Sequence, residues 1–106
     1  MTEELHNIVT VQATLTRREM LRYTPAGIPV VDALLTHQSL QTEAGHARQV
    51  EFELPARFAA EQAERIARVD LGAAIDATGF LAPRRKGSRG LQLHITRFSV
   101  SDRSGH

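Results

Sequence analysis

The sequence predicts an all-β domain with one short helix, folded as a five-stranded barrel with the element order β-β-β-α-β-β. Its 106 residues are enough for one domain with a single modest core. Apolar and polar residues alternate in several separate segments, which is the pattern of strands with one buried face. Only one segment has the three- and four-residue apolar spacing of an amphipathic helix.

The first two predicted strands flank a turn. Residues 9–16 alternate strictly, with an apolar face formed by Val9, Val11, Ala13 and Leu15. Residues 23–29 contain two prolines and a glycine, which are residue types that punctuate turns. Residues 30–41 are again rich in β-forming residues, and one face of this second strand is formed by Val31, Ala33 and Leu35.

A hairpin and a helix follow. Residues 42–47 are polar and include a glycine, which predicts a loop into a third strand at residues 48–54, antiparallel to the second. We expect Pro55 to end this strand. Residues 56–68 then place apolar residues at helical spacing among charged ones, which predicts a short amphipathic helix.

Two further strands are predicted at residues 73–81 and 91–100. The apolar face of the last strand is formed by Leu91, Leu93 and Ile95. Phe98 and Val100 fall out of that phase, so we expect a bulge or twist near Arg97.

Five strands with a helix between the third and fourth are typical of an OB-fold barrel, which binds ligands around strands 2 and 3 and loops 1–2 and 4–5. An SH3-like barrel is the nearest alternative, but it normally lacks a helix of this length at this point. We therefore expect residues 1–106 to form a single OB-fold domain, with residues 101–106 as a disordered tail.

The composition excludes several function classes. There is no cysteine, so a disulfide framework, a zinc ribbon and a thiol nucleophile are all excluded. The N-terminus carries acidic residues where a signal peptide has basic ones, and no apolar run approaches the ~20 residues that span a bilayer. We expect a soluble, cytoplasmic protein that makes no membrane contact.

Positive charge is concentrated towards the C-terminus. Residues 1–83 hold 7 basic and 11 acidic side chains, whereas residues 84–106 hold 6 basic and 1 acidic. Four cations lie in the predicted loop between the last two strands: Arg84, Arg85, Lys86 and Arg89. Such a loop can bind a phosphate backbone without reading sequence. The alternative interpretation is a solvated turn that serves only solubility.

Other candidate binding residues lie in the elements by which an OB-fold barrel binds nucleic acid. Arg17, Arg18 and Arg22 fall in the predicted loop between the first two strands, and Arg48 opens the third strand. Phe52 is the one aromatic residue near the expected binding face. Because alternation groups Phe52 with the apolar residues of its strand, packing in the core is favoured over base stacking.

The residues give little indication of catalysis or metal binding. His37, His46 and His94 show no metal-ligand spacing with a carboxylate, so we expect no metal and no cofactor. Glu51 and Glu53 point the same way on one strand, but a paired-acid hydrolase would also need a cleft that a domain of this size hardly offers. We expect a binding protein and not an enzyme.

Two motifs carry a family resemblance. Residues 23–29, Tyr-Thr-Pro-Ala-Gly-Ile-Pro, resemble the Pro-x-Gly turn after the first strand of bacterial single-stranded-DNA-binding proteins. Residues 37–49, His-Gln-Ser-Leu-Gln-Thr-Glu-Ala-Gly-His-Ala-Arg-Gln, resemble the corresponding segment of the PriB family, the primosomal replication proteins N. The resemblance extends over residues 7–100 and includes Leu54-Pro55 and Thr78-Gly79-Phe80.

The resemblance implies a non-catalytic OB-fold homodimer that binds single-stranded DNA. It also implies that the protein helps the PriA helicase to reload the replication machinery at stalled forks, with DnaT and SSB as further candidate partners. We expect the dimer to form near residues 9–15, where an exposed strand edge needs cover. At positions that match the family, the implied DNA contacts are Arg22, Arg48, Arg84, Arg85, Lys86 and Arg89.

This chain departs from the family pattern at two positions. The better-known members have a tryptophan where this chain has Glu51, and an arginine where it has Gln38. Stacking contributes ~1–3 kcal/mol per base, so its loss is expected to weaken DNA binding tenfold or more. The chain also stops at residue 106 without the acidic-hydrophobic tip by which SSB recruits partners. We expect contact with protein to matter relatively more here, and an OB-fold protein-interaction module with little DNA affinity is the alternative.

Overall fold

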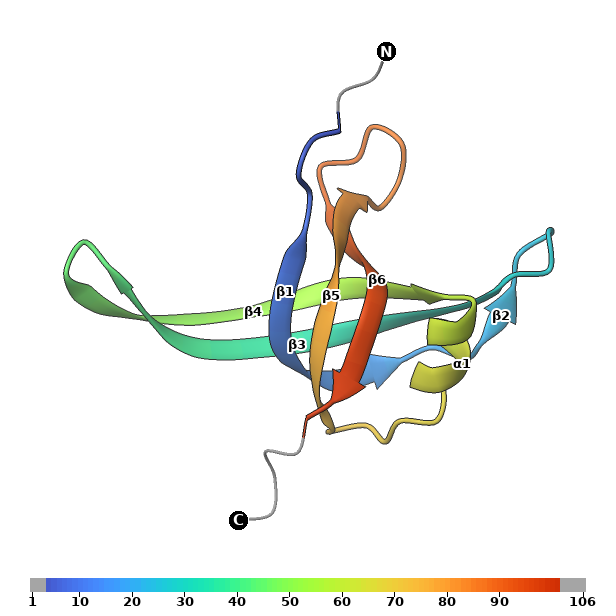
Figure 1. Ribbon diagram of the computed structural model, residues 1–106, viewed down its shortest axis with the longest axis horizontal. Coiled ribbons are helices and arrows are strands. Elements are labelled where there is room, and N and C mark those ends of the chain that lie inside the picture. The colour runs from blue at the N-terminus through green and yellow to red at the C-terminus, as the bar shows by residue number, and fades with distance from the viewer. Residues whose placement is uncertain (1–3, 102–106) are drawn as a thin grey trace.

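The computed structural model describes residues 4–101. Its elements are β1 (Val9–Arg18), β2 (Arg22–Tyr23), β3 (Pro29–Glu43), β4 (His46–Ala59), α1 (Glu61–Ile66), β5 (Ala74–Pro83) and β6 (Leu91–Val100). Neighbouring strands follow the order β1-β5-β6-β4-β3-β2, and β1 also pairs with β3. That additional pairing closes the five long strands into a barrel (Figure 1), so the predicted OB-fold is confirmed.

Strand β1 closes the barrel because it has two different neighbours. Its first part, residues 9–14, pairs with β5, and its last part pairs with β3. The two pairings meet at Thr14, and a register shift between Leu15 and Arg17 marks a bulge in the part that pairs with β3. Arg17 and Arg18 therefore lie in β1, and Arg22 lies in β2. The prediction of a loop for these arginines was wrong, because apolar alternation stops at the bulge while the strand continues.

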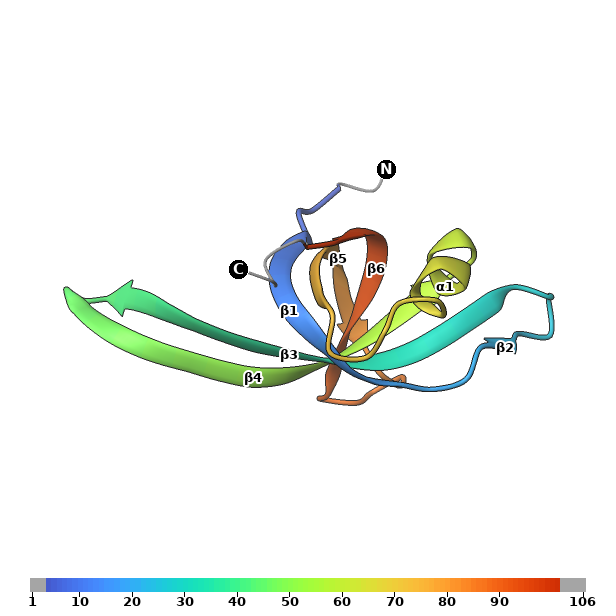
Figure 2. The ribbon, with the colours of Figure 1, turned by 90° about the horizontal axis from the view of Figure 1, so that it is seen from below.

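The β3–β4 hairpin extends well beyond the barrel. The two strands pair continuously up to Ala44 and Gly45, whose φ angles of 53° and 80° are typical of a two-residue type I′ turn. The connecting loop is thus shorter than the predicted residues 42–47. Beyond Thr36, β4 is the one strand among the described residues that pairs with β3. Residues 37–52, here called the hairpin arm, project from the barrel at the left of Figures 1 and 2.

Strand β4 continues past Pro55, where we expected it to end. Ala56 and Phe58 are completely buried in strand alternation, and α1 begins only at Glu61. Pairing of β4 with β6 starts at Ala56, so at Pro55 the side of β4 that faces away from β3 has no strand partner among residues 4–101. Proline, which has no N–H, is tolerated at such an edge. The helix is therefore shorter than the predicted residues 56–68.

The irregularity expected near Arg97 is confirmed. The β5–β6 register shifts between Thr78 and Gly79, and Thr96 is the extra residue on β6. The bulge turns Phe98 back into the core, where it is only 6% exposed.

The barrel interior holds one core. Its largest fully buried side chains are Phe58, Leu15, Leu35, Ile66, Ile75, Leu93 and Val31. Helix α1 adds Ala63 and Ile66 to this core, and the guanidinium of Arg65 lies 4.3 Å from the centre of the Phe98 ring. Within residues 4–101, no helix has the length and apolar character needed to span a membrane. Of the tail expected at residues 101–106, only Ser101 lies within the described residues.

Candidate nucleic-acid interface

A pocket of about 480 Å³ opens where the end of β1 meets β3, β4, β6 and the loop after β5. Its apolar lining is formed by Ala33, Leu34 and Pro55. The other lining residues are polar or charged, namely Glu19, Asp32, Gln92 and the five arginines Arg17, Arg18, Arg57, Arg84 and Arg85. We call this site the arginine pocket. Its lining carries an excess of positive charge, because five guanidinium groups face two carboxylates.

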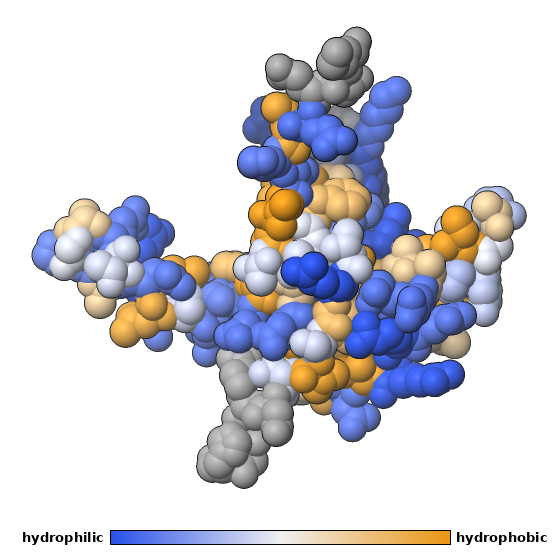
Figure 3. All heavy atoms as spheres, viewed as in Figure 1, coloured by the Kyte–Doolittle hydropathy of each residue, from blue (hydrophilic) through white to orange (hydrophobic). Residues whose placement is uncertain are grey.

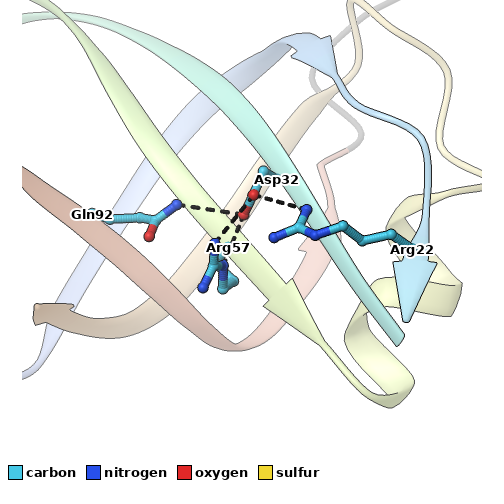
Figure 4. Close-up of polar contacts among 4 residues, drawn as sticks. All are labelled: Arg22, Asp32, Arg57 and Gln92. Atoms are coloured by element: carbon cyan, nitrogen blue, oxygen red, sulfur yellow. Dashed lines mark hydrogen bonds and ion pairs between the residues drawn. The ribbon is translucent and has the colours of Figure 1, made fainter. Parts of the chain in front are cut away.

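Asp32 is the centre of the hydrogen-bond network in this pocket (Figure 4). Arg57, directly opposite on β4, donates from Nε to Oδ1 at 2.8 Å and from Nη2 to Oδ2 at 3.2 Å. Arg22 Nη1 lies 3.0 Å from Oδ2. Gln92 Nε2 approaches Oδ1 at 3.5 Å, the outer limit for a hydrogen bond. The bidentate contact fixes the Arg57 guanidinium plane at the pocket wall.

The charges of this network persist at neutral pH. Burial raises the pKa of the Asp32 carboxyl, but hydrogen bonds and positive charge from Arg57 and Arg22 outweigh burial and hold the pKa below its ordinary value. The hydrogen bond to Asp32 in turn raises the pKa of Arg57. Asp32 therefore stays an anion and offsets part of the positive charge of its two arginine partners.

Three arginines of the pocket are free to bind an anion. Within the described part of the chain, no hydrogen bond or ion pair engages the side chains of Arg17, Arg84 and Arg85, and all three residues are exposed. Arg18 differs, because its Nη1 donates to the backbone carbonyl oxygens of Ile66 and Val69. Arg18 therefore ties β1 to the end of α1.

The loop at residues 84–90, here called the basic loop, presents its cations outwards. The Arg84 N–H donates to the Gly90 carbonyl at 2.9 Å, and the Ser88 N–H donates to the Arg85 carbonyl at 2.9 Å. Gly87 takes a φ of 78°, which glycine adopts without strain. These contacts close the loop, while Lys86 and Arg89 lie exposed outside the pocket lining.

The hairpin arm has a different electrostatic character. Arg48 Nη1 lies 2.6 Å from Glu43 Oε1, so this candidate cation is already paired, although both side chains are about two-thirds exposed. Gln38 donates to Glu51 Oε2 at 2.6 Å across the two strands. Glu53, directly next to the arm on β4, adds another exposed carboxylate. In Figure 3 hydrophilic and hydrophobic residues lie side by side on the arm. Within residues 37–52 the carboxylates Glu43 and Glu51 outnumber the cation Arg48.

Phe52 lies on this arm and not in the core. It is 40% exposed, and its ring stacks on that of His37 with 4.9 Å between centroids and 22° between planes. His37 is held in turn by Nδ1, which donates to the Gln12 carbonyl at 2.6 Å. The prediction that Phe52 packs in the core was wrong, because alternation identifies the apolar face of a strand, and at Phe52 this face lies outside the core cluster.

A second stacked pair lies on β5 and β6. The Phe80 and His94 rings are 5.0 Å apart and inclined by 10°, and Phe80 is 41% exposed. Burial, followed by the positive charge of Arg57, lowers the pKa of His94, while Asp32 opposes that shift. This environment therefore favours the neutral form of His94.

The structure brings together only part of the predicted site. Arg17, Arg84 and Arg85 meet in the arginine pocket, Lys86 and Arg89 flank it on the basic loop, and Arg22 reaches it through Asp32. Arg48 and Phe52 belong to the hairpin arm and do not line the pocket.

Sequence reasoning missed Asp32, Arg57 and Gln92. The type I′ turn fixes the hairpin register along its whole length and places Arg57 opposite Asp32. This pair could have been found had β4 been extended through Pro55. No local pattern marks Gln92. Within residues 4–101, no three His, Asp or Glu side chains gather as they would around a metal ion.

An OB-fold barrel with a cationic pocket at its loop mouth has the architecture of an oligonucleotide-binding protein. Comparison with known sequences supports this class. Residues 7–97 match the model of a family described as another single-strand binding protein family. Replication restart protein PriB of Nitrosomonas europaea is 42% identical over 89 residues, which is 84% of this chain and 82% of that protein. PriB of Neisseria meningitidis serogroup B is 40% identical over 83 residues, 78% of this chain and 82% of that protein.

Solved structures of PriB and of a single-stranded DNA binding protein have the same fold as this chain. PriB from Ralstonia solanacearum superposes with a TM-score of 0.83 at 40% identity, covering 91% of this chain and 98% of that one. The single-stranded DNA binding protein from Thermus aquaticus superposes with a TM-score of 0.75 at 28% identity, covering 92% of this chain but 51% of its own. The chain belongs to the PriB family of replication restart proteins, within the single-strand binding proteins.

Proposed function

We propose that this protein is a single-stranded-DNA-binding accessory factor of replication restart, and that it binds and stimulates the PriA helicase at stalled forks. It acts as a binding protein in the cytoplasm. The proposed DNA contacts are Arg17, Arg84, Arg85, Lys86 and Arg89, with Arg22, Arg48 and Phe52 as further candidates. The relatives named PriB and the single-stranded DNA binding protein from Thermus aquaticus support this function.

The observation that carries the proposal is the set of unengaged cations around one concave site. Arg17, Arg84 and Arg85 converge on the arginine pocket, and their guanidinium groups have no intramolecular partner within the described residues. Cations that serve the fold are held by carboxylates or carbonyls, as Arg57 and Arg18 are here. Free cations at a concave site suit phosphate groups, which supply most of the affinity of sequence-independent binding.

The DNA contact is tested by fluorescence anisotropy with an internally labelled 30-nucleotide single strand at several salt concentrations. Each phosphate contact adds about −0.7 to the slope of log K against log salt, so neutralising three cations should make the slope shallower by about 2. The test variant is Arg84→Gln/Arg85→Gln/Lys86→Gln. The control is Arg68→Gln/Arg97→Gln, which removes exposed cations outside the pocket and basic loop. Equal slopes for the wild type and the triple variant would contradict the proposal.

A homodimer is part of the same proposal. Residues 9–13 of β1 pair with β5 on one side, and within residues 4–101 no strand pairs with their other side, so a second copy has an open edge to pair with. Light scattering coupled to size-exclusion chromatography should give twice the mass of the 11.7 kDa chain. Contact with PriA is tested by isothermal titration and co-elution, and the absence of both heat and co-elution would count against it. DnaT and SSB are tested in the same way.

The second candidate function is a protein-interaction module with little DNA affinity. The hairpin arm and the adjoining part of β4 favour it, because Arg48 is paired with Glu43 while Glu51 and Glu53 add exposed carboxylates. A phosphate backbone is repelled by such a surface. If reversing the charges of the basic loop leaves DNA retention unchanged, this second function is supported and the first is not.

A further inference from the structure

We propose that the arginine pocket is a binding site for a phosphomonoester, carried by a terminal nucleotide of a strand or by a free nucleotide. This inference rests on the proposed function, since both place nucleic-acid phosphate on the same arginines. It adds a preference for a phosphorylated end, which binding to a strand interior does not require.

The charge of the pocket exceeds what one internal phosphate needs. Asp32 offsets part of the charge of Arg22 and Arg57, while Arg17, Arg84 and Arg85 remain unengaged within the described residues. A phosphomonoester carries about −1.5 to −2 at pH 7, against one negative charge for each internal phosphodiester. Guanidinium groups bind such oxygens in a planar, bidentate manner. Three free guanidinium groups around one pocket therefore suit the more highly charged group.

The shape of the pocket favours a strand end. Its walls come from the end of β1, from β3, β4 and β6, and from the basic loop. The pocket is open to solvent on one side and walled by these elements on the others, so a strand end can fill it from the open side, whereas a strand interior must both enter and leave. The volume of about 480 Å³ exceeds the needs of a phosphate alone and is typical of a small-molecule site. Leu34 and Pro55 supply apolar surface for the sugar and base.

Gln92 is a polar group built into this site. It is only 6% exposed, yet its amide Nε2 comes no closer than 3.5 Å to Asp32 Oδ1. Buried amides normally have closer partners than this. Gln92 lines the pocket, and Figure 4 shows its amide at the wall beside Asp32 and Arg57. A hydroxyl or base edge of a bound nucleotide can complete its hydrogen bonding.

The experiment is a competition assay in which unlabelled octanucleotides displace the internally labelled 30-mer. Three octamers of one sequence carry a 5′-phosphate, a 3′-phosphate or hydroxyl groups at both ends, and dTMP is the fourth competitor. We expect one phosphorylated octamer to compete about tenfold better than the hydroxyl octamer, because charge-assisted hydrogen bonds are the strong ones. The 5′ and 3′ arms identify the end, and displacement by dTMP shows that a free nucleotide suffices.

Two variants locate the effect. Gln92→Leu and Arg17→Gln, which change the pocket lining, should each lower the ratio of phosphorylated to hydroxyl affinity at least threefold. The matched control Lys86→Gln/Arg89→Gln changes cations that do not line the pocket, and should weaken both octamers while keeping the ratio. Circular dichroism and thermal melting verify that each variant is folded.

The outcomes separate this inference from the proposed function. If wild-type protein binds the 30-mer but all octamers compete equally and dTMP does not displace it, the phosphomonoester site is wrong and DNA binding stands. If the 30-mer does not bind, the proposed function fails, and calorimetric titration with dTMP then tests the pocket directly. No heat in that titration would overturn the phosphomonoester site as well.

Discussion

Replacing Gly79 with alanine places a methyl group against the backbone of β6. At the β5–β6 bulge, a Cβ on Gly79 would lie 2.8 Å from the carbonyl carbon of His94 and 3.0 Å from Ile95 Cα, and would overlap the His94 carbonyl oxygen. Overpacking of a core costs ~1–3 kcal/mol. Because the obstacle is paired backbone and not a flexible side chain, we expect about 3 kcal/mol, the upper end of that range.

For a domain of this size, that loss corresponds to a fall in Tm of about 12 °C or more. The assay is thermal unfolding followed by circular dichroism at one fixed protein concentration, since any oligomer makes Tm concentration-dependent. Gly90→Ala is the matched control, because its Cβ would meet only ordinary contacts at 3.5 Å from Arg84 and Ser88 side-chain atoms. If Gly79→Ala melts no lower than Gly90→Ala, the close approach of β6 at the bulge is refuted.

Three further variants test other parts of the structure. The pKa of His94 is lowered in the folded protein, so the unfolded chain binds the proton more readily. The free energy of unfolding should therefore fall as the pH drops below about 6.5. The variant His94→Gln should show a smaller change in urea midpoint between pH 7.5 and 5.5 than the wild type. Arg57→Met removes the bidentate partner of Asp32 and should lower the free energy of unfolding in urea at pH 7 by about 1–2 kcal/mol. An unchanged free energy of unfolding would show that the pair is not stabilising. Ala60 has a φ of 57° and a ψ of −128°, a backbone region that only glycine adopts without strain. Ala60→Gly should therefore stabilise the protein by about 1 kcal/mol in urea unfolding. A lower stability of this variant would contradict backbone strain at Ala60.

Most strands could be predicted because each has its own local pattern. Alternation identified the first part of β1, and the phase change before Phe98 identified the bulge in β6. Alternation failed where strands bend or leave the barrel. β1 continues as a strand to Arg18 after its apolar pattern stops, and Phe52 alternates with apolar residues on an arm that has no core.

The arginine pocket could be predicted only in part. The density of cations at residues 84–89 marks the basic loop in the sequence itself. Arg17, Arg57 and Gln92, by contrast, come from three strands that meet only when the barrel closes. Their proximity depends on register and strand order, which composition does not encode. Arg57 also followed Pro55, and the assumption that proline ends a strand assigned it to a helix.

The two neighbours of β1 constrain when the protein can fold during its synthesis. Residues 9–14 leave the ribosome early, but their partner strand β5 begins at Ala74, some 60 residues later. At roughly 5–20 residues per second, the edge of β1 waits for at least several seconds before its partner is available. The β3–β4 hairpin needs only adjacent residues and can form in the meantime. The chain is therefore expected to emerge with a finished hairpin and an open first strand, and to close its barrel only after β5 and β6 have been made.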